Sequence, residues 1–572
     1  MGAVTKAFDY LVPPEMAADV RVGTLVRIPL HGRRVGGWVV DLPDRPGTDR
    51  ELQPVTRVSG WGPPAEVVEL ARWAAWRWAG RLSALLGTAS PPRAVRRLPP
   101  TPPVSSRGES LGDGQGLVAE AFALPASVVR LAPAADVEPL LVAAAQREDP
   151  LVLFPSLGAA RFFAARLRLA GHRVAVLPDQ WAEAAAGGCV AVGARAAAWA
   201  PRPRLGAIVV VDEHDEAYQQ EQAPTWNARD VALERARRAG VPCVLTSPCP
   251  SLEALEVAAL VAPSRAEERG GWALIDVVDR RAEPPGSGLY SERLVALVRQ
   301  AGPGRRVVCV LNRKGRARLL ACGSCGELAR CSACGSSVEQ AEPSGLTCRR
   351  CGAHREGFCT ACGSTRMKAL RVGVTRAREE LEMLAGLPVA EVTAETAAGP
   401  PPEAPVLIGT EAVLHRVAGA SAVAFLDIDQ ELLAPRYRAA EQAFALLARA
   451  ARLVGPRDGG GRVLLQTRLG GHESIDAALH ADPSRLAVAE RARRAALGLP
   501  PESAVAVVSG AAAPAFVSGL DAAAHAGVAV AGPSADGRWM VKAADHRTLC
   551  DALAAVARPP GRLRVEVDPL RA

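Results

Sequence analysis

The chain has 572 residues, of which 49% are hydrophobic and 22% charged, so it can bury several cores and we expect three or four globular domains. Its net charge of +8 rests almost wholly on arginine, which suits phosphate contacts, but an alanine- and arginine-rich genome gives the same bias. Because no apolar run approaches the ~18 residues that span a bilayer and the start lacks a secretory signal, we expect a cytoplasmic protein without membrane association.

The first 97 residues are predicted to form a small, separate, β-rich domain. Short β-like runs cover Phe8 to Val12, Thr24 to Pro29 and Gly37 to Val40, and a helical stretch around Trp73 to Trp78 follows them. Residues 98–116 are rich in Pro, Ser and Gly and contain too few large apolar groups to fold. We therefore expect a linker there.

Two blocks of alternating strand-like and helical segments come next, in residues 117–265 and in residues 266–320 with 367–470. Such alternation predicts an α/β fold with mostly parallel sheets covered by helices. A small α+β domain is predicted for residues 471–572. The strand-like runs of the two blocks begin at Leu151, Val174, Cys189, Ala207 and Cys243, and at Val307, Val406, Val423 and Val463.

A cysteine-rich module, residues 321–366, interrupts the second block. Two Cys-x-x-Cys pairs together supply the four thiolates that bind one tetrahedral ion. Eight cysteines in four such pairs therefore fit two structural Zn²⁺ ions. A shell of four cysteines leaves no position for water, which predicts an architectural site and not a catalytic one. His354 is expected to be a surface residue. The four pairs are Cys322 and Cys325, Cys331 and Cys334, Cys348 and Cys351, and Cys359 and Cys362.

Motifs spread along the chain resemble the PriA family of primosomal replication-restart proteins. The resemblance implies two RecA-like helicase lobes, with a double-zinc module of Cys₄ sites inserted in the second, an N-terminal domain that binds the 3′ end of DNA, and a C-terminal fork-binding domain. It also implies a nested pairing, with Cys322, Cys325, Cys359 and Cys362 around one ion and Cys331, Cys334, Cys348 and Cys351 around the other. The motifs are FDYLVP at Phe8, VLNRKG at Val310, the four cysteine pairs, VLIGTEAVL at Val406, FLDIDQELLAPRYRAAEQ at Phe425, LPP at Leu499 and VDP at Val567.

The resemblance also implies a pocket for a DNA 3′ end. In it Phe8 and Tyr10 supply aromatic rings, Asp9 accepts a hydrogen bond from the 3′ hydroxyl, and Gly32 allows close approach of the backbone. The alternative is that Phe8 and Tyr10 are ordinary core aromatics. A lysine of the family's pocket is Gln53 here, and only the linker occupies the interval in which the family carries a winged-helix domain.

The nucleotide-binding motifs of the family are degenerate in this chain. A phosphate-binding loop needs glycines and a lysine, but residues 128–141 read VVRLAPAADVEPLL, and no lysine lies between Lys6 and Lys314. The acidic motif after the strand at Ala207 is reduced to Asp212, Glu213 and His214, because valine replaces its first carboxylate. Ser247-Pro248-Cys249 replaces Ser-Ala-Thr, and Arg452 is at best a displaced remnant of the arginine finger.

We therefore predict a replication restart protein that binds stalled or abandoned replication forks and promotes primosome assembly and replicative helicase loading, without helicase or ATPase activity. Its expected partners are forked DNA, primosome proteins, the loader of the replicative helicase and single-stranded DNA-binding protein, on the nucleoid in the cytoplasm. Two alternatives stay open. One is an active helicase with an atypical nucleotide site, and the other is a zinc-ribbon adaptor in another nucleic-acid process.

Overall fold

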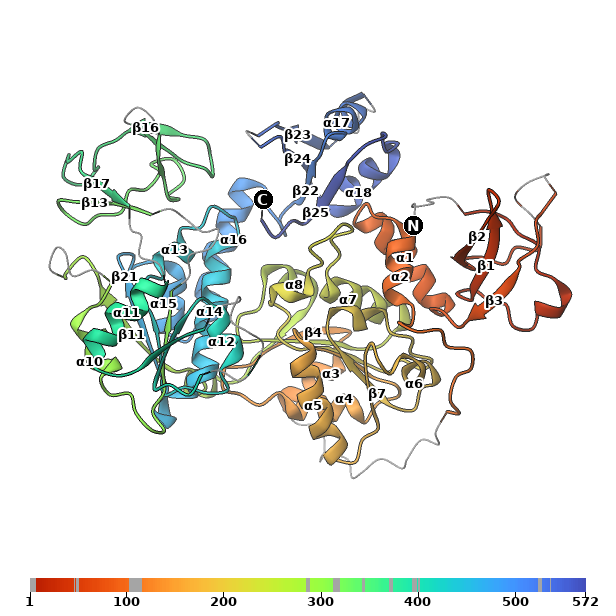
Figure 1. The fold of residues 1–572 in the computed structure, drawn as a ribbon, viewed down its shortest axis with the longest axis horizontal. Coiled ribbons are helices and arrows are strands. Elements are labelled where there is room, and N and C mark those ends of the chain that lie inside the picture. Colours follow the sequence, from red (N-terminus) through yellow and green to blue (C-terminus); the bar gives the residue numbers. More distant parts are fainter. Residues whose placement is uncertain are drawn as a thin grey trace. The chain divides into compact units, whose positions relative to one another are not determined.

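The computed structural model describes residues 7–45, 47, 51–101, 116–283, 289–311, 319–341, 345–369, 374–392, 399, 402–522, 527–534 and 536–571 (Figure 1). The chain forms two compact units. The first contains Met1–Arg130, Val137–Ala262 and Arg494–Leu570, and the second contains Leu131–Asp136, Pro263–Arg493 and Arg571–Ala572. Among the described residues, no helix combines the length and the apolar character needed to cross a membrane.

The first unit begins with a three-stranded antiparallel sheet in the order β2-β1-β3. The predicted strand from Phe8 to Val12 is wrong, because within it only Leu11 makes a bridge, with Pro54. The hairpin between β1 and β2 turns at His31 and Gly32, both with positive φ, and glycine adopts that conformation at no steric cost. The elements of this region are η1 (Pro14–Met16), β1 (Leu25–Leu30), β2 (Arg33–Trp38), β3 (Arg57–Gly60), α1 (Ala65–Arg77) and α2 (Leu82–Ala89).

A seven-stranded sheet follows in the same unit, with every neighbouring pair parallel and the order β10-β4-β9-β8-β5-β7-β6. The five strands predicted in this block are confirmed, and β4 and β10 are additional. The elements are α3 (Leu117–Ala123), β4 (Ala126–Arg130), α4 (Glu138–Ala145), β5 (Leu151–Leu153), α5 (Leu157–Leu169), β6 (Val174–Val176), α6 (Trp181–Ala186), β7 (Val190–Gly193), η2 (Arg195–Trp199), β8 (Ile208–Val210), η3 (Glu216–Tyr218), α7 (Ala228–Ala239), β9 (Cys243–Ser247), α8 (Leu252–Val257) and β10 (Ala259–Val261).

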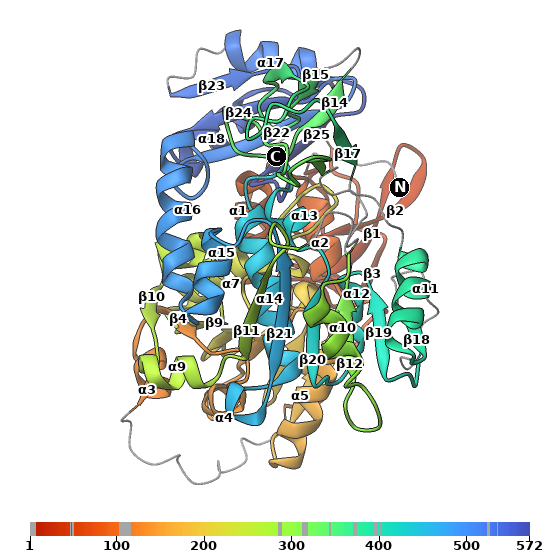
Figure 2. The ribbon, with the colours of Figure 1, turned by 90° about the vertical axis from the view of Figure 1, so that its left-hand side faces the viewer.

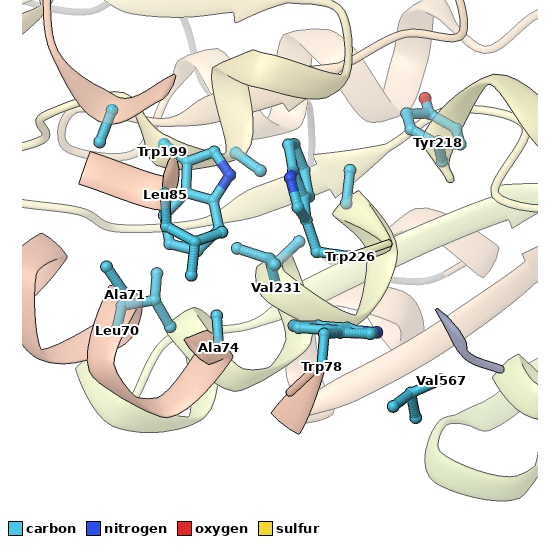
Figure 3. Close-up of a cluster of buried hydrophobic side chains, with 14 of the residues drawn as sticks. Leu70, Ala71, Ala74, Trp78, Leu85, Trp199, Tyr218, Trp226, Val231 and Val567 are labelled. Carbon is cyan, nitrogen blue, oxygen red and sulfur yellow. The ribbon is translucent and has the colours of Figure 1, made fainter. Parts of the chain in front are cut away.

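Helices α1 and α2 share one hydrophobic cluster with the seven-stranded block (Figure 3). Trp78, directly after α1, and Leu85 of α2 are fully buried. Trp199 and Trp226 of the block meet edge to face, with ring centroids 5.5 Å apart. The helical half of the N-terminal region therefore packs into the core of the first lobe. The predicted linker is also packed at its start, where Leu98 contacts the cluster and Thr101 donates to the carbonyl oxygen of Ala186. Residues 102–115 lie outside the described residues.

The second unit contains a six-stranded, all-parallel sheet in the order β11-β21-β20-β12-β19-β18, which can be followed in Figure 2. The four strands predicted for this block are confirmed, and β11 and β18 are additional. Its elements are α9 (Arg265–Gly270), β11 (Leu274–Asp279), α10 (Glu292–Val298), β12 (Val307–Val310), α11 (Val374–Ala385), β18 (Val389–Val392), β19 (Val406–Gly409), α12 (Ala412–Arg416), β20 (Ala422–Phe425), α13 (Asp429–Leu432), α14 (Ala439–Val454), η4 (Arg457–Gly459), β21 (Arg462–Thr467), α15 (Glu473–Leu479) and α16 (Pro483–Leu497).

The cysteine module lies between β12 and α11, as predicted. Its first and last strands, β13 (Leu320–Cys322) and β17 (Met367–Ala369), pair antiparallel and close its base, while β14 (Glu339–Ala341), β15 (Gly345–Thr347) and β16 (His354–Glu356) form a small sheet (Figure 1). The Asn-Arg-Lys-Gly part of VLNRKG, including Lys314, lies outside the described residues.

The C-terminal segment forms a four-stranded antiparallel sheet with two helices, which is the predicted α+β architecture. The second unit continues to Arg493, beyond the predicted boundary at 470, because α15 packs on α14, where Ser474 donates to the carbonyl oxygen of Ala440. In the first unit, Asp568 pairs with Arg77 of α1 at 2.6 Å. The elements are β22 (Ala504–Ser509), α17 (Ala513–Ala522), β23 (Val528–Ala531), β24 (Trp539–Ala543), α18 (His546–Ala555) and β25 (Arg564–Val567).

Candidate functional site

The four Cys-x-x-Cys-Gly segments adopt the same turn. In each, the glycine N–H donates to the carbonyl oxygen of the first cysteine at 2.8 or 2.9 Å, and the N–H of that cysteine donates to the carbonyl oxygen five residues further on at 2.8 or 2.9 Å. The glycine has a φ between +70° and +75°, in the left-handed region that side chains disfavour. The turn directs both thiols of a pair to one side. The four glycines are Gly326, Gly335, Gly352 and Gly363.

The eight thiols gather into two groups of four. The first group, which we call cluster A, is Cys322, Cys325, Cys359 and Cys362, and the second, cluster B, is Cys331, Cys334, Cys348 and Cys351. Within each group the ligand atoms lie within 4.8 Å of one another. These are the two sets that the resemblance to the PriA family implies. They join segments that are distant in the chain, with Sγ–Sγ distances of 3.5 Å for Cys322 and Cys362 and for Cys331 and Cys351.

The donor chemistry of both clusters fits a soft, tetrahedral metal ion. Burial acts to raise the pKa of Cys322, yet hydrogen bonds from the backbone N–H groups of Cys325 and Ser324 outweigh it and lower this pKa to about 6. The same balance lowers the pKa of Cys331 to about 7. Since thiolates and not thiols bind metal, these backbone donors favour the metal-binding form of Cys322 and Cys331, one cysteine in each cluster. His354 is exposed, bonded to Thr347 and in neither cluster, as expected for a surface residue.

The Asp212-Glu213-His214 segment follows β8, and its Glu213 is enclosed by protein. Its Oε1 accepts from the N–H of Ser251 at 2.8 Å, and its Oε2 accepts from the hydroxyl of Ser251 at 2.8 Å and from Arg229 at 3.2 Å. Ser251 is the N-cap of α8, and its hydroxyl also accepts from Ala254. Glu213 is 1% exposed, so its carboxylate holds the start of a helix and a buried arginine in place.

The other two residues of the motif contact the end of β9, the sheet neighbour of β8. Asp212 has a φ of +53°, and its N–H donates to the Thr246 hydroxyl at 3.3 Å. His214 Nδ1 lies 2.8 Å from the hydroxyl of Ser247, in the Ser247-Pro248-Cys249 segment. Thus Asp212, Glu213 and His214 all contact residues at or just after β9.

The segment in the place of a phosphate-binding loop joins β4 to α4. Residues 131–136 of this segment belong to the second unit, as does Gly271. Pro133 has no N–H. The N–H of Ala135 donates to the carbonyl oxygen of Ala132 at 2.9 Å, and the N–H of Ala134 donates to the carbonyl oxygen of Gly271 at 3.1 Å. In the same unit Arg452, the expected finger remnant, donates from Nε to the carbonyl oxygen of Pro133 at 3.0 Å. Of the backbone N–H groups in this segment, those of Ala134 and Ala135 are therefore already bonded, and Pro133 has none to offer a phosphate.

The segment with Phe8, Asp9 and Tyr10 runs beside the three-stranded sheet. Phe8 is 47% exposed, Asp9 Oδ2 accepts from the N–H of Gly47 at 2.9 Å, and the Tyr10 hydroxyl donates to the carbonyl oxygen of Pro29 at 2.7 Å. Gly32 lies in the β1–β2 turn, and a Cβ added there would meet nothing within 4 Å. Of the three residues, Tyr10 therefore contacts the strand that leads into the Gly32 turn, whereas Asp9 contacts Gly47.

Comparison with known proteins agrees with this arrangement. Residues 2–91 match the family model of the PriA 3'DNA-binding domain (3'BD). The probable replication restart protein PriA of Mycobacterium leprae is 31% identical over 569 residues, covering 88% of this chain and 85% of that protein. The chain belongs to the PriA family.

Two further PriA relatives match over part of their length. The replication restart protein PriA of Treponema pallidum is 31% identical, in a match that covers 55% of this chain and 50% of that protein. The replication restart protein PriA of Bacillus subtilis is 28% identical, in a match that covers 56% of this chain and 43% of that protein. The match thus spans about half of these two relatives.

The helicase-like fold of PriA is visible in the two parallel sheets. Two solved structures, a DEAD box protein from Methanococcus jannaschii and the DEAH/RHA helicase HrpB of Escherichia coli, align with 67% and 64% of this chain, respectively. The aligned parts cover 88% and 43% of those two chains, at 8% and 12% identity. Their TM-scores are only 0.28 and 0.32, so we assign the fold from the strand order of this chain and its membership of the PriA family.

Sequence reasoning about the PriA motifs missed the partners of Glu213. Ser251 stands before the apolar helical run that starts at Leu252, and this N-cap signal is readable in the sequence. Arg229 gave no comparable signal, because it is one of many arginines in α7 and lies 16 residues from Glu213. Only the packing of α7 over the sheet distinguishes it.

Proposed function

We propose that this protein is a replication restart protein that binds stalled or abandoned replication forks and promotes primosome assembly without hydrolysing ATP. The observation that carries the proposal is the enclosure of Glu213 by Ser251 and Arg229. A carboxylate that activates water must reach that water, but this one is buried and already accepts three hydrogen bonds. The bonded backbone of Ala134 and Ala135 supports the same conclusion for phosphate binding.

DNA binding is supported by the N-terminal sheet. Arg27 lies directly opposite Gly36 and Arg57 in the register, and Arg34 lies two residues from Gly36, so three exposed arginines share one face. An added Cβ at Gly36 would lie 3.8 Å from the guanidinium of Arg27, which agrees with this face. Guanidinium groups on one face suit a phosphate backbone, and the exposed ring of Phe8 can stack on a terminal base.

The two cysteine clusters are proposed to hold one Zn²⁺ each. Four sulfur donors in a tetrahedral set favour zinc over Mg²⁺ or Ca²⁺, which prefer oxygen. Bound zinc supplies folding energy to a module with a small apolar core and has no open position for chemistry. The proposed partners are forked DNA, primosome proteins, the replicative helicase loader and single-stranded DNA-binding protein, on the nucleoid in the cytoplasm.

Two measurements on the full chain test this function. Fluorescence anisotropy with a forked and a blunt duplex of equal length should show tighter binding to the fork, whereas equal affinities would favour the zinc-ribbon adaptor. A steady-state ATPase assay with the same fork should stay at background for the wild type and for Glu213→Gln. Turnover that depends on Glu213 would instead establish an active helicase with an atypical nucleotide site.

A further inference from the structure

The two cysteine clusters differ in their exposure to solvent. In cluster A, Cys325 and Cys362 are exposed, whereas in cluster B only Cys351 is exposed. Cys348 of cluster B is fully buried, and Cys334 is partly buried. Cluster A therefore offers two exposed cysteines to small oxidants, whereas cluster B offers one.

The surroundings of the clusters differ in the same sense. Cys331 and Cys348 of cluster B belong to a small apolar core, in which Val338 and Leu346 are each 1% exposed. Beside cluster A, the hydroxyl groups of Ser324 and Ser364 lie 2.9 Å apart in an exposed contact. Apolar packing excludes water and dissolved oxidants from sulfur, whereas hydroxyl groups at a surface do not.

Cluster A also lies at the closure of the module. Cys322 belongs to β13, which enters the module, and it pairs in register with Met367 of β17, which leaves it. The N–H of Gly323 donates to the carbonyl oxygen of Arg366 at 2.7 Å, next to the same pair of strands. An ion in cluster A therefore joins the two ends of the module, while cluster B is held within it.

We propose that cluster A is an oxidation-sensitive site, which releases its metal ion when hydrogen peroxide oxidises its cysteines, while cluster B retains its metal ion. The proposal rests on the zinc occupancy proposed above. The Cys362 thiolate attacks hydrogen peroxide, breaking the O–O bond and giving a sulfenic acid and hydroxide. The Cys322 thiolate, 3.5 Å away, then attacks that sulfur, forms the disulfide and releases a second hydroxide. The two sulfurs lose two electrons to the peroxide, and the ion loses two ligands.

Release of the ion from cluster A should open the base of the module and leave its inner half folded. A thiol reductant reverses the disulfide, and added Zn²⁺ then restores the site. The inserted module would in this way respond to peroxide in two separate steps, with the first step reversible.

The test uses the full chain with its metal content first measured by mass spectrometry. Hydrogen peroxide is added in small excess, released Zn²⁺ is followed with a chromogenic chelator, and cysteines are alkylated and mapped by peptide mass spectrometry when one ion has left. We expect two kinetic phases, with the first several-fold faster and a disulfide within cluster A at its end. Equal rates, or a disulfide first in cluster B, would overturn the proposal.

Two variants sharpen this experiment. Leu346→Ala thins the apolar cover of cluster B, so it should bring the two rates closer together. Leu381→Ala makes the same change in the core of the second sheet and should leave their ratio unaltered. Should Leu346→Ala fail to fold, the peptide map of oxidised cysteines in the wild type still shows which cluster forms a disulfide first. A chain that contains no metal before peroxide is added would refute the zinc occupancy itself, which is a different result from two equal rates.

Discussion

Glu213 and Arg229 form a 3.2 Å ion pair in which both side chains are almost completely buried. Asp230 and Glu213 together outweigh the cost of burial and raise the pKa of Arg229, so the arginine stays charged. Glu213 is thus part of the internal structure of its lobe. This relationship gives the first prediction.

Replacing Glu213 by Gln should lower the stability of the first parallel-sheet lobe by roughly 3 kcal/mol, because it leaves a buried arginine with one carboxylate fewer. Urea unfolding followed by circular dichroism measures the change. Glu221→Gln, at an exposed position in the same lobe, is the matched control and should stay within about 0.5 kcal/mol of the wild type. An unchanged midpoint for Glu213→Gln would show that the pair contributes nothing.

Metal analysis of the purified chain should give two zinc ions, and Cys331→Ser should lose the ion of cluster B and unfold the module without melting the sheets. The physical reason is that three thiolates hold a structural ion far less tightly than four. Limited proteolysis should then cut within residues 321–366, while the circular dichroism of the lobes persists. Cys189→Ser, outside both clusters, should keep both ions.

Asp9→Ala should weaken binding to forks that end in a 3′ hydroxyl more than to forks that end in a 3′ phosphate. The difference should be about 1–3 kcal/mol, the value of a charge-assisted hydrogen bond. Anisotropy titrations of both forks measure it, with Asp41→Ala as the control at an exposed carboxylate of the same region. Equal losses on the two forks would leave Asp9 with only its contact to Gly47.

Gln53→Lys should restore one phosphate contact. Gln53 is exposed, and its backbone carbonyl oxygen accepts from the N–H of Leu11, which directly follows Phe8, Asp9 and Tyr10. The plot of log affinity against log salt concentration should therefore steepen by about one unit relative to the wild type. An identical slope would mean that DNA does not pass this position.

Asp429 should make the second sheet lobe less stable as the pH rises. Burial and the neighbouring Asp427 raise the pKa of Asp429 to about 7, so the folded chain binds a proton that the unfolded chain has released. Between roughly pH 4 and 7 the free energy of unfolding should fall by at most about 1.4 kcal/mol per pH unit. Asp429→Asn should remove this slope, as urea midpoints at several pH values would show. A variant with the same slope as the wild type would refute the assignment.

The spacing of residues in the sequence determined the local structures of this protein, namely the cysteine turns and most of the buried strands. Each Cys-x-x-Cys-Gly segment forms its turn within six residues, so the pairs and the number of possible ions followed from the sequence. The strands of both sheets were predicted where runs of Val, Ile and Leu are continuous, because buried parallel strands need apolar side chains on both faces. The strands β4, β10, β11 and β18 were missed, since polar residues within them or helical residues beside them mask their pattern.

Tertiary structure alone decided which distant groups meet. Without the family resemblance, the spacing of the cysteines allows more than one partition into fours, and the chain path sets Cys322 beside Cys362 across 40 residues. The environment of Glu213 depends on α7 and α8 packing at the ends of β8 and β9, which no local pattern specifies. The sequence could not place α1 in the core of the first lobe either. An apolar helix face shows that the helix is packed against other residues but does not identify those residues.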